Sequence, residues 1–261
     1  MINDSYFITS FSFGPKYKDI QTHWEKRIRE KCKNAIPVIF RNTKGQELLN
    51  PIEAWWDIIR TKNILGLSMQ ERRPVVQCDL DIIIEKDIQP IIDLDYDFII
   101  SKEHFGENAY PVECSNKLGF GVCSGFYILK PSGFGFLASL YELMTKLKYG
   151  VYSDQVTLMN YIVQSDYKLS HESLEIDGTK YINTIVELDG YRICVLDFEL
   201  VRRDPLERNK QFASHINVDS IGGIKQLVRY YYEDYKTLPL SCGCSIKKNL
   251  KCYYHHRRVK L

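Results

Sequence analysis

Short apolar runs that resemble buried strands alternate along this chain with longer segments of helical spacing. Such alternation favours an α/β layer architecture, in which helices cover the faces of a buried sheet. The strand-like runs are residues 6–11, 36–40, 74–84, 98–101, 120–130, 182–185 and 191–196. The helical segments are residues 18–32, 51–67, 133–148 and 154–162. No linker or internal repeat divides the series, so we expect one domain over residues 1–240 and an extension at 241–261.

The composition is that of a globular protein with a substantial core. The chain has 261 residues, of which 44% are hydrophobic and 26% charged. These values exclude collagen-like, low-complexity and disordered proteins. Its 35 Lys and Arg balance 33 Asp and Glu, but residues 247–261 contain six basic residues and no acidic one. Because the rest of the chain is net acidic, we expect no nucleic-acid partner and assign the basic character to the tail.

The sequence contains neither a membrane-spanning segment nor a secretion signal by the usual criteria. No stretch approaches the roughly 20 apolar residues that a span requires, and residues 1–4 lack a basic region followed by an apolar one. We therefore expect a cytoplasmic protein with reduced thiols. Five cysteines in apolar surroundings are predicted to be small core residues: Cys32, Cys78, Cys114, Cys123 and Cys194.

The C-terminal extension holds four residues that could bind zinc, namely Cys242, Cys244, Cys252 and His255. Their spacing is not that of a standard zinc finger. The alternative is an extension packed by its aromatic residues, whose positive charge could contact an anionic membrane surface. Both interpretations stay open at this point.

A pair of carboxylates, Asp79 and Asp81, follows the strand-like residues 75–78 within the run at 74–84. In open α/β sheets, ligands gather beyond the carboxyl ends of the strands, so a site is expected there. Carboxylates two residues apart can approach one divalent cation, whose remaining ligands are typically waters and substrate phosphates. The simpler alternative is that aspartate commonly ends a strand.

A second acidic segment, Asp93, Asp95 and Asp97, resembles a calcium loop only superficially. It has Phe98 where an EF-hand loop needs glycine, and His104 where the loop needs glutamate. It also precedes a strand instead of following one. We interpret it as a solvated turn.

The order of further segments around the first carboxylate pair carries more information than any one of them. The series is an early strand, a helix with Arg60 and Lys62, the Asp79–Asp81 pair, Ser124-Gly125-Phe126 within a long strand, Ser153-Asp154-Gln155 with Asn160, and Ser214-His215-Ile216-Asn217 with Lys225. Over residues 5–230 this series resembles the metal-dependent nucleotide-sugar glycosyltransferases of GT-A fold. The resemblance is to the group that includes plant cell-wall xylosyltransferases and, more distantly, to the glycogenin-like group. It implies a Rossmann-like mixed sheet flanked by helices.

The resemblance implies that Asp79, Asp81 and His215 hold Mn²⁺ or Mg²⁺ against the diphosphate of the donor. An imidazole in an oxygen-rich shell favours Mn²⁺ over Mg²⁺. Lys225 would neutralise the same diphosphate. The alternatives are a structural histidine and an ordinary solvated lysine.

The resemblance also implies a donor-binding surface on the first strand and the second helix. Thr9 and Ser10 would line the pocket for the base and ribose. Arg60 and Lys62 would lie near the nucleotide, although a solvated helix face explains them nearly as well.

Two further segments would contact the donor sugar. Ser124 and Gly125 match a segment whose backbone approaches the sugar, and a glycine within a strand suggests either such an approach or a β-bulge. By the resemblance, Asp154 and Gln155 face the anomeric carbon, where the reaction develops positive charge. Helix capping by Ser153 and a first-turn acid would also explain their positions.

These observations predict a glycosyltransferase that moves a sugar from a nucleotide-diphospho-sugar, a UDP-sugar in our interpretation, to a glycan or other hydroxyl acceptor. The resemblance favours retention of configuration; if the reaction instead inverts configuration, Asp154 would be the general base. Two alternatives remain. A nucleotidyltransferase would need a Gly-rich basic loop after the first strand, of which residues 11–16 are a poor version. A non-catalytic binding module with a zinc-binding or basic tail is the other.

Overall fold

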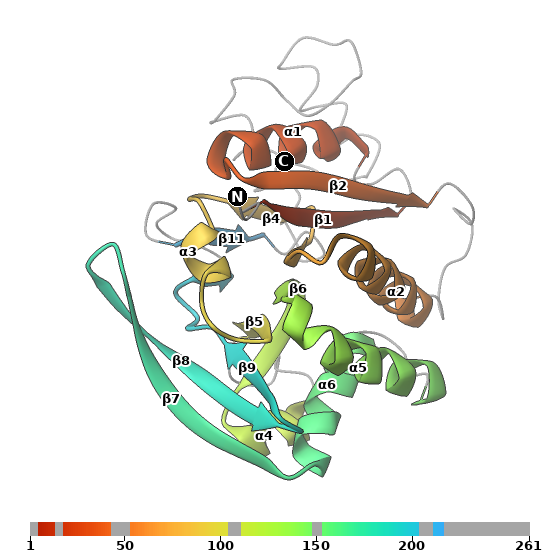
Figure 1. The fold of residues 1–261 in the computed structure, drawn as a ribbon, viewed down its shortest axis with the longest axis vertical. Helices are drawn as coiled ribbons and strands as arrows, with labels where there is room; N and C mark the ends of the chain where they lie inside the picture. Colours follow the sequence, from red (N-terminus) through yellow and green to blue (C-terminus); the bar gives the residue numbers. More distant parts are fainter. Residues whose placement is uncertain are drawn as a thin grey trace, which may run out of the picture.

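A mixed sheet of eight strands runs through the molecule in the order β2-β1-β3-β6-β5-β9-β8-β7 (Figure 1). The computed structural model describes residues 5–13, 18–42, 53–103, 111–147, 153–203 and 211–216. The strands of the large sheet are β1 (Tyr6–Phe13), β2 (Ala35–Asn42), β3 (Val75–Cys78), β5 (Phe98–Glu103), β6 (Gly121–Leu129), β7 (Tyr167–Ile176), β8 (Thr179–Leu188) and β9 (Tyr191–Val195).

The first half of the sheet has Rossmann-like topology. Strand β1 pairs in parallel with both β2 and β3, as expected for strands joined by helical crossovers. Strand β6 then runs antiparallel to β3 and β5, and β9 returns parallel to β5. The edge is an antiparallel hairpin of β7 and β8, which extends beyond the other strands in Figure 1.

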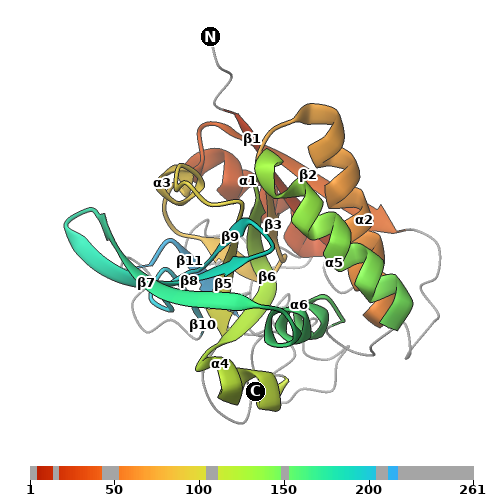
Figure 2. The same cartoon turned by 60° about the horizontal axis from the view of Figure 1, so that its bottom comes forward.

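Alternation of side chains along the strands divides the core between the two faces of the sheet. In β1, Tyr6 and Ile8 pack on one face, with Trp24 and Ile28 of α1 (Lys18–Lys31), and Phe7 packs on the other. The second face is covered by α2 (Glu53–Glu71), α4 (Val112–Leu118), α5 (Phe134–Leu147) and α6 (Ser153–Gln164). Figure 2 shows α2 and α5 lying side by side on this face, with α6 next to them.

A small three-stranded sheet lies on the α1 side of the large one. Its order is β10 (Val201–Arg203), β11 (Ala213–His215) and β4 (Ile82–Ile84). Two short helical turns, α3 (Gln89–Ile92) and η2 (Pro131–Gly133), complete the elements. Because β4 and β11 pair antiparallel, this sheet joins residue 82 to a segment more than 130 positions later in the chain.

The structure confirms the predicted α/β class with a mixed sheet flanked by helices, and corrects several details. The run at 74–84 is not one strand but β3 and β4, separated by a turn at 79–81. Strand β7 and helix α4 were not expected. The acidic segment before β5 is a turn in which Asp93 and Asp95 are exposed, as predicted. The five described cysteines are buried, also as predicted.

Within the part of the chain that the structure describes, no helix is both long and apolar enough to cross a membrane.

Candidate active site

The turn between β3 and β4 places Asp79 and Asp81 at the carboxyl end of β3. The backbone N–H of Asp79 donates to the carbonyl oxygen of Gly125 in β6 at 2.9 Å, which continues the β3–β6 pairing by one residue. The carbonyl oxygen of Asp79 accepts from the N–H of Ile82 at 2.9 Å and closes the turn. Both carboxylates are therefore fixed by the backbone of the sheet.

His215 reaches the same place from the small sheet. The antiparallel register sets His215 opposite Ile82, and the N–H of Ile216 donates to the carbonyl oxygen of Asp81 at 2.9 Å. Nε2 of His215 then lies 3.7 Å from Oδ1 of Asp81. Nδ1 lies 3.7 Å from the Cys123 sulfur on the other side of the ring.

Gly125 forms the floor beneath these side chains. A Cβ atom at this position would lie 3.0 Å from Oδ2 of Asp79 and 3.4 Å from Cε1 of His215. The β5–β6 register shifts here, from Ile100 opposite Tyr127 to Ser101 opposite Cys123. The resulting bulge leaves residues 124–126 without partners in β5. Bulges of this kind redirect side chains beside functional sites.

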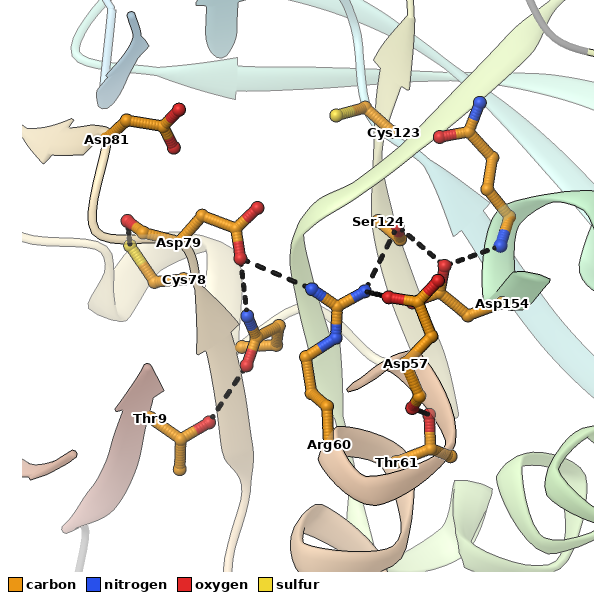
Figure 3. A network of polar contacts seen from close by, with 12 residues as sticks. Thr9, Asp57, Arg60, Thr61, Cys78, Asp79, Asp81, Cys123, Ser124 and Asp154 are labelled. Carbon is orange, nitrogen blue, oxygen red and sulfur yellow. Dashed lines mark hydrogen bonds and ion pairs between the residues drawn. The ribbon is translucent and has the colours of Figure 1, made fainter. Parts of the chain in front are cut away.

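Next to this group, Arg60 of α2 joins three carboxylates (Figure 3). One terminal nitrogen lies 3.3 Å from Oδ1 of Asp79. The other lies 3.0 Å from Oδ1 of Asp57 and forms an ion pair with Asp154 at the start of α6. The hydroxyl of Ser124 donates to Asp154 at 2.9 Å. A single guanidinium thus links the Asp79–Asp81 turn to the first turn of α6.

Asp57 is a member of this network that sequence reasoning missed. Its Oδ2 accepts from the backbone N–H of Ser153 at 2.9 Å and lies 3.4 Å from the Ser153 hydroxyl. The only sequence signal is its position three residues before Arg60, on the same face of α2. This spacing indicates a role for Asp57 only once the structure shows that α6 packs beside α2.

The carboxylates in this region outnumber the cations. Burial and the charge of Asp154 raise the pKa of Asp57 to about 8, against the lowering effect of Arg60. Burial raises the pKa of Asp79 to about 6, again opposed by Arg60 and reinforced by Asp81. Burial alone would lower the pKa of Arg60, but its three carboxylate neighbours raise it well above the ordinary value. Such an excess of negative charge favours the binding of a cation.

We compared the chain with known protein families, curated sequences and solved structures. No protein-family model and no curated protein sequence matches the chain. Among solved structures, a glycosyltransferase involved in the glycosylation of the major capsid of PBCV-1 superposes with a TM-score of 0.58 at 13% identity, covering 88% of this chain and 99% of the other. The galactosyltransferase LgtC gives 0.51 at 12% identity, covering 89% and 97%. Apo GlyE of Streptococcus pneumoniae TIGR4 gives 0.52 at 14% identity, covering 98% and 64%.

This chain has the GT-A glycosyltransferase fold. The expected fold is thereby confirmed, and its sheet order explains why the site lies where it does. In this GT-A sheet, β3 stands between β1 and β6, so the Asp79–Asp81 turn opens between the carboxyl end of β1 and the bulge of β6.

The two β1 residues predicted to line a base pocket are fully buried in the GT-A core. The hydroxyl of Thr9 donates to the carbonyl oxygen of Val76 at 3.0 Å and lies 3.3 Å from Oε1 of Gln77. The side-chain amide of Gln77 donates to Oδ1 of Asp79 at 2.9 Å. Thr9 therefore helps to orient Asp79 through Gln77. Ser10 is likewise buried.

The remaining predicted residues fall into three groups. Lys62 lies on α2 two residues after Arg60 but is exposed, so the GT-A fold does not bring it into the Arg60 network. Gln155 is buried at the start of α6, and its N–H donates to Oδ1 of Asp154 at 2.8 Å. Lys225 and the four tail residues proposed for zinc lie outside the described residues.

The donor set fits a hard divalent cation. Oδ1 of Asp79 is held by Gln77 and Arg60, whereas Oδ2 faces the gap above Gly125, near His215. Two carboxylates and an imidazole around this gap match the preferences of Mn²⁺ and Mg²⁺. Across the described ranges, no three Asp, Glu, His or Cys side chains already stand at the spacing of a closed metal site.

Proposed function

We propose that this protein is a glycosyltransferase that moves a sugar from a nucleotide-diphospho-sugar, most simply a UDP-sugar, to a hydroxyl group of a glycan or other acceptor. The observation that carries the proposal is that Asp79 and His215 both lie next to Gly125, with Asp81 beside His215 and with the Arg60–Asp154 pair adjoining Asp79. The arrangement supports a cation-binding group next to a buried carboxylate. Both features would assist transfer of a glycosyl group from a diphosphate, the cation by stabilising the departing diphosphate and the carboxylate by stabilising positive charge on the sugar.

Asp79, Asp81 and His215 would hold the divalent cation, Mn²⁺ in preference to Mg²⁺ because of the imidazole. When bound, such a cation supplies Lewis-acid stabilisation of the departing diphosphate. Arg60 keeps Asp79 in place and remains charged. Lys225 is proposed as a second positive group for the diphosphate.

For the base and ribose we propose the carboxyl end of β1, which follows the buried residues Thr9 and Ser10 in the middle of that strand. Thr9 supports the site indirectly, through Gln77 and Asp79. Residues 124–126 of the β6 bulge would approach the donor sugar with their backbone, since Gly125 carries no side chain there.

Asp154 would stabilise positive charge at the anomeric carbon, with Gln155 beside it. Both oxygens of Asp154 already accept hydrogen bonds, one from Arg60 and the other from Ser124 and from the N–H of Gln155. A carboxylate held in this way is better placed to act as a fixed charge than as a proton acceptor. In a retaining reaction, the bond from the anomeric carbon to the phosphate oxygen breaks. A bond to the acceptor oxygen forms, and the acceptor proton passes to the departing phosphate.

We also propose a cytoplasmic location. The division into a catalytic domain over residues 1–240 and a basic extension at 241–261 is part of the same proposal. The extension would provide peripheral contact with an anionic membrane surface through its excess of Lys and Arg.

A screen of UDP- and GDP-sugars tests the proposal by measuring release of free nucleoside diphosphate with Mn²⁺ present and with Mn²⁺ replaced by a chelator. We expect release from at least one donor, dependent on the metal and accelerated by an acceptor. The nucleotidyltransferase alternative predicts pyrophosphate release from a nucleoside triphosphate and a sugar 1-phosphate instead. Absence of diphosphate release from every donor, with no binding of Mn²⁺–UDP by calorimetry, would contradict the proposal.

A further inference from the structure

Asp57 lies in the Arg60 network but does not contact the group of Asp79, Asp81 and His215. It and Arg60 are three residues apart on α2, so both side chains leave the helix on one face. Ser153 and Asp154 are the first two residues of α6. Asp57 and Arg60 face Asp154 where α2 packs against α6 (Figure 3).

Four hydrogen-bonded residues close a ring between the two helices. Oδ2 of Asp57 accepts from the N–H of Ser153 at 2.9 Å, and Oδ1 lies 3.0 Å from a terminal nitrogen of Arg60. The same nitrogen of Arg60 pairs with Oδ2 of Asp154. The peptide bond between Ser153 and Asp154 completes the ring. Asp57 is the member on α2 that holds both Arg60 and the backbone of α6.

Neutralising Arg60 does not require this third carboxylate. Asp79 and Asp154 already surround the guanidinium, and another buried carboxylate adds repulsion and a desolvation cost. The Asp57 side chain is only 15% exposed. Burying this carboxylate costs free energy, which indicates that its contacts serve a structural purpose. The ring shows which one: Asp57 fixes the start of α6 relative to α2.

We infer that Asp57 is a positioning residue for glycosyl transfer, which holds Arg60 and the first turn of α6 so that Asp154 faces the reacting carbon. This inference rests on the proposed function. Asp57 binds the N–H of Ser153 directly but reaches Asp79 through Arg60, so we expect its main effect on the transfer step and a smaller one on donor binding. Displacement of a catalytic group by about 1 Å can cost up to roughly 100-fold in rate.

The variant Asp57→Asn separates the two contacts of Asp57. Its amide oxygen can still accept from the N–H of Ser153, but its NH₂ group then faces Arg60 and cannot accept from it. The matched control is Asp97→Asn. Oδ2 of Asp97 also accepts a backbone N–H, that of Arg192 at 2.8 Å, but at the amino end of β5, away from the site.

The measurements, made at a pH above 8 so that Asp57, whose pKa is about 8, is ionised, are kcat and donor KM for the UDP-sugar that is turned over, together with calorimetric binding of Mn²⁺–UDP. For Asp57→Asn we expect kcat to fall about tenfold or more, with KM and Mn²⁺–UDP affinity within about threefold of wild type. Asp97→Asn should match wild type in all three. A kcat within about twofold of wild type, or a loss of Mn²⁺–UDP binding parallel to the loss of rate, would overturn the inference.

Hydrogen exchange keeps this test separate from the proposed function. If wild type turns over no nucleotide-sugar, the proposed function has failed, but the ring still predicts the protection of α6. Asp57→Ala removes the acceptor of the Ser153 N–H, and amides in the first turn of α6 should exchange about tenfold or more faster in this variant than in wild type or Asp97→Ala. Unchanged exchange there would show that Asp57 does not hold the helix, and would overturn its positioning role.

Discussion

Gly125 is the residue whose lack of a side chain matters most to the site. A methyl group there would lie 3.0 Å from Oδ2 of Asp79 and 3.4 Å from the ring of His215. A Cβ–oxygen distance of 3.0 Å is tighter than most real contacts, so Asp79 would have to shift by a few tenths of an ångström, whereas the 3.4 Å distances to His215 and to Ile82 of the core are close to ordinary contact. The consequence therefore falls first on Asp79, a proposed cation ligand.

Gly125→Ala should therefore weaken Mn²⁺–UDP binding by about tenfold while leaving the thermal unfolding midpoint within a few degrees of wild type. Calorimetry and a thermal melt measure the two quantities. Gly66→Ala is the control, because a Cβ atom at Gly66 in the middle of α2 would meet nothing within 4 Å. Wild-type affinity in Gly125→Ala would show that the gap above this residue is not used.

Asp57 should make the stability of the metal-free protein depend on pH. Its pKa is about 8 in the folded protein against an ordinary value of 3.8. Between these values the native state retains a proton that the unfolded state has released, so the free energy of unfolding falls as pH rises. Asp79, whose pKa is about 6, contributes with the same sign at lower pH. The interval from pH 6.5 to 8 therefore isolates Asp57.

Urea denaturation at pH 6.5 and at pH 8 measures this effect. We expect wild type and Asp97→Asn to lose about 1–2 kcal/mol over that interval, given 1.36 kcal/mol for each unit of pKa difference. Asp57→Asn should lose clearly less. An equal loss in Asp57→Asn would assign the pH dependence to other groups.

At the scale of elements, β11 is the smallest piece of structure on which the site depends. It has three residues and carries His215. A buried network holds it: the hydroxyl of Ser214 donates to Oε1 of Glu85 at 2.9 Å, and Oε2 of Glu85 lies 2.6 Å from Arg27 of α1. So short a strand needs such support, since its own pairing gives little stability.

Glu85→Ala should destabilise the protein by about 3 kcal/mol, because it leaves Arg27 buried without this partner. Besides this loss of global stability, we expect a local effect, namely faster hydrogen exchange at the amides of β11. Glu142→Ala is the control, since its pair with Lys146 on α5 is largely exposed and should add little. If hydrogen exchange in β11 were unchanged in Glu85→Ala, the network of Ser214, Glu85 and Arg27 would not be what holds His215 in position.

Elements also show where sequence reasoning stops. The apolar runs of β1, β3 and β6 are visible in the sequence because both faces of each strand are buried. Strand β7 is an exposed edge strand whose ten residues are mostly polar, so no hydrophobic pattern marks it. The turn at 79–81 was read as part of a strand because Leu80 and the three isoleucines of β4 continue the apolar run.

At the scale of the whole molecule, the order of motifs along the chain predicted the GT-A fold, and the three-dimensional neighbours confirm it. The same order brought Asp79, Asp81, Arg60, Ser124, Gly125, Asp154 and His215 into one list. It did not reveal that Lys62 points outward or that Asp57 belongs with Arg60. Those facts depend on how α2 lies against α6, and helix packing is not encoded in the spacing of motifs.

The structure shows where some of the excess acidic residues outside the tail are located. Part of that excess is concentrated around Arg60 and the Asp79–Asp81 turn, where carboxylates outnumber cations. A bound divalent cation would offset it. The central claim is therefore that Asp79 belongs to a metal-dependent donor site.

The most direct test of that claim is the initial rate of UDP release from the preferred UDP-sugar, with Mn²⁺ and with a chelator, for wild type, Asp79→Asn and Asp95→Asn. Asp95 belongs to the exposed acidic turn before β5 and is the matched control. Wild type and Asp95→Asn should release UDP at equal rates, in both cases only with Mn²⁺. Asp79→Asn should be slower by about 100-fold or more. A wild-type rate in Asp79→Asn, or release that persists in the chelator, would contradict the account.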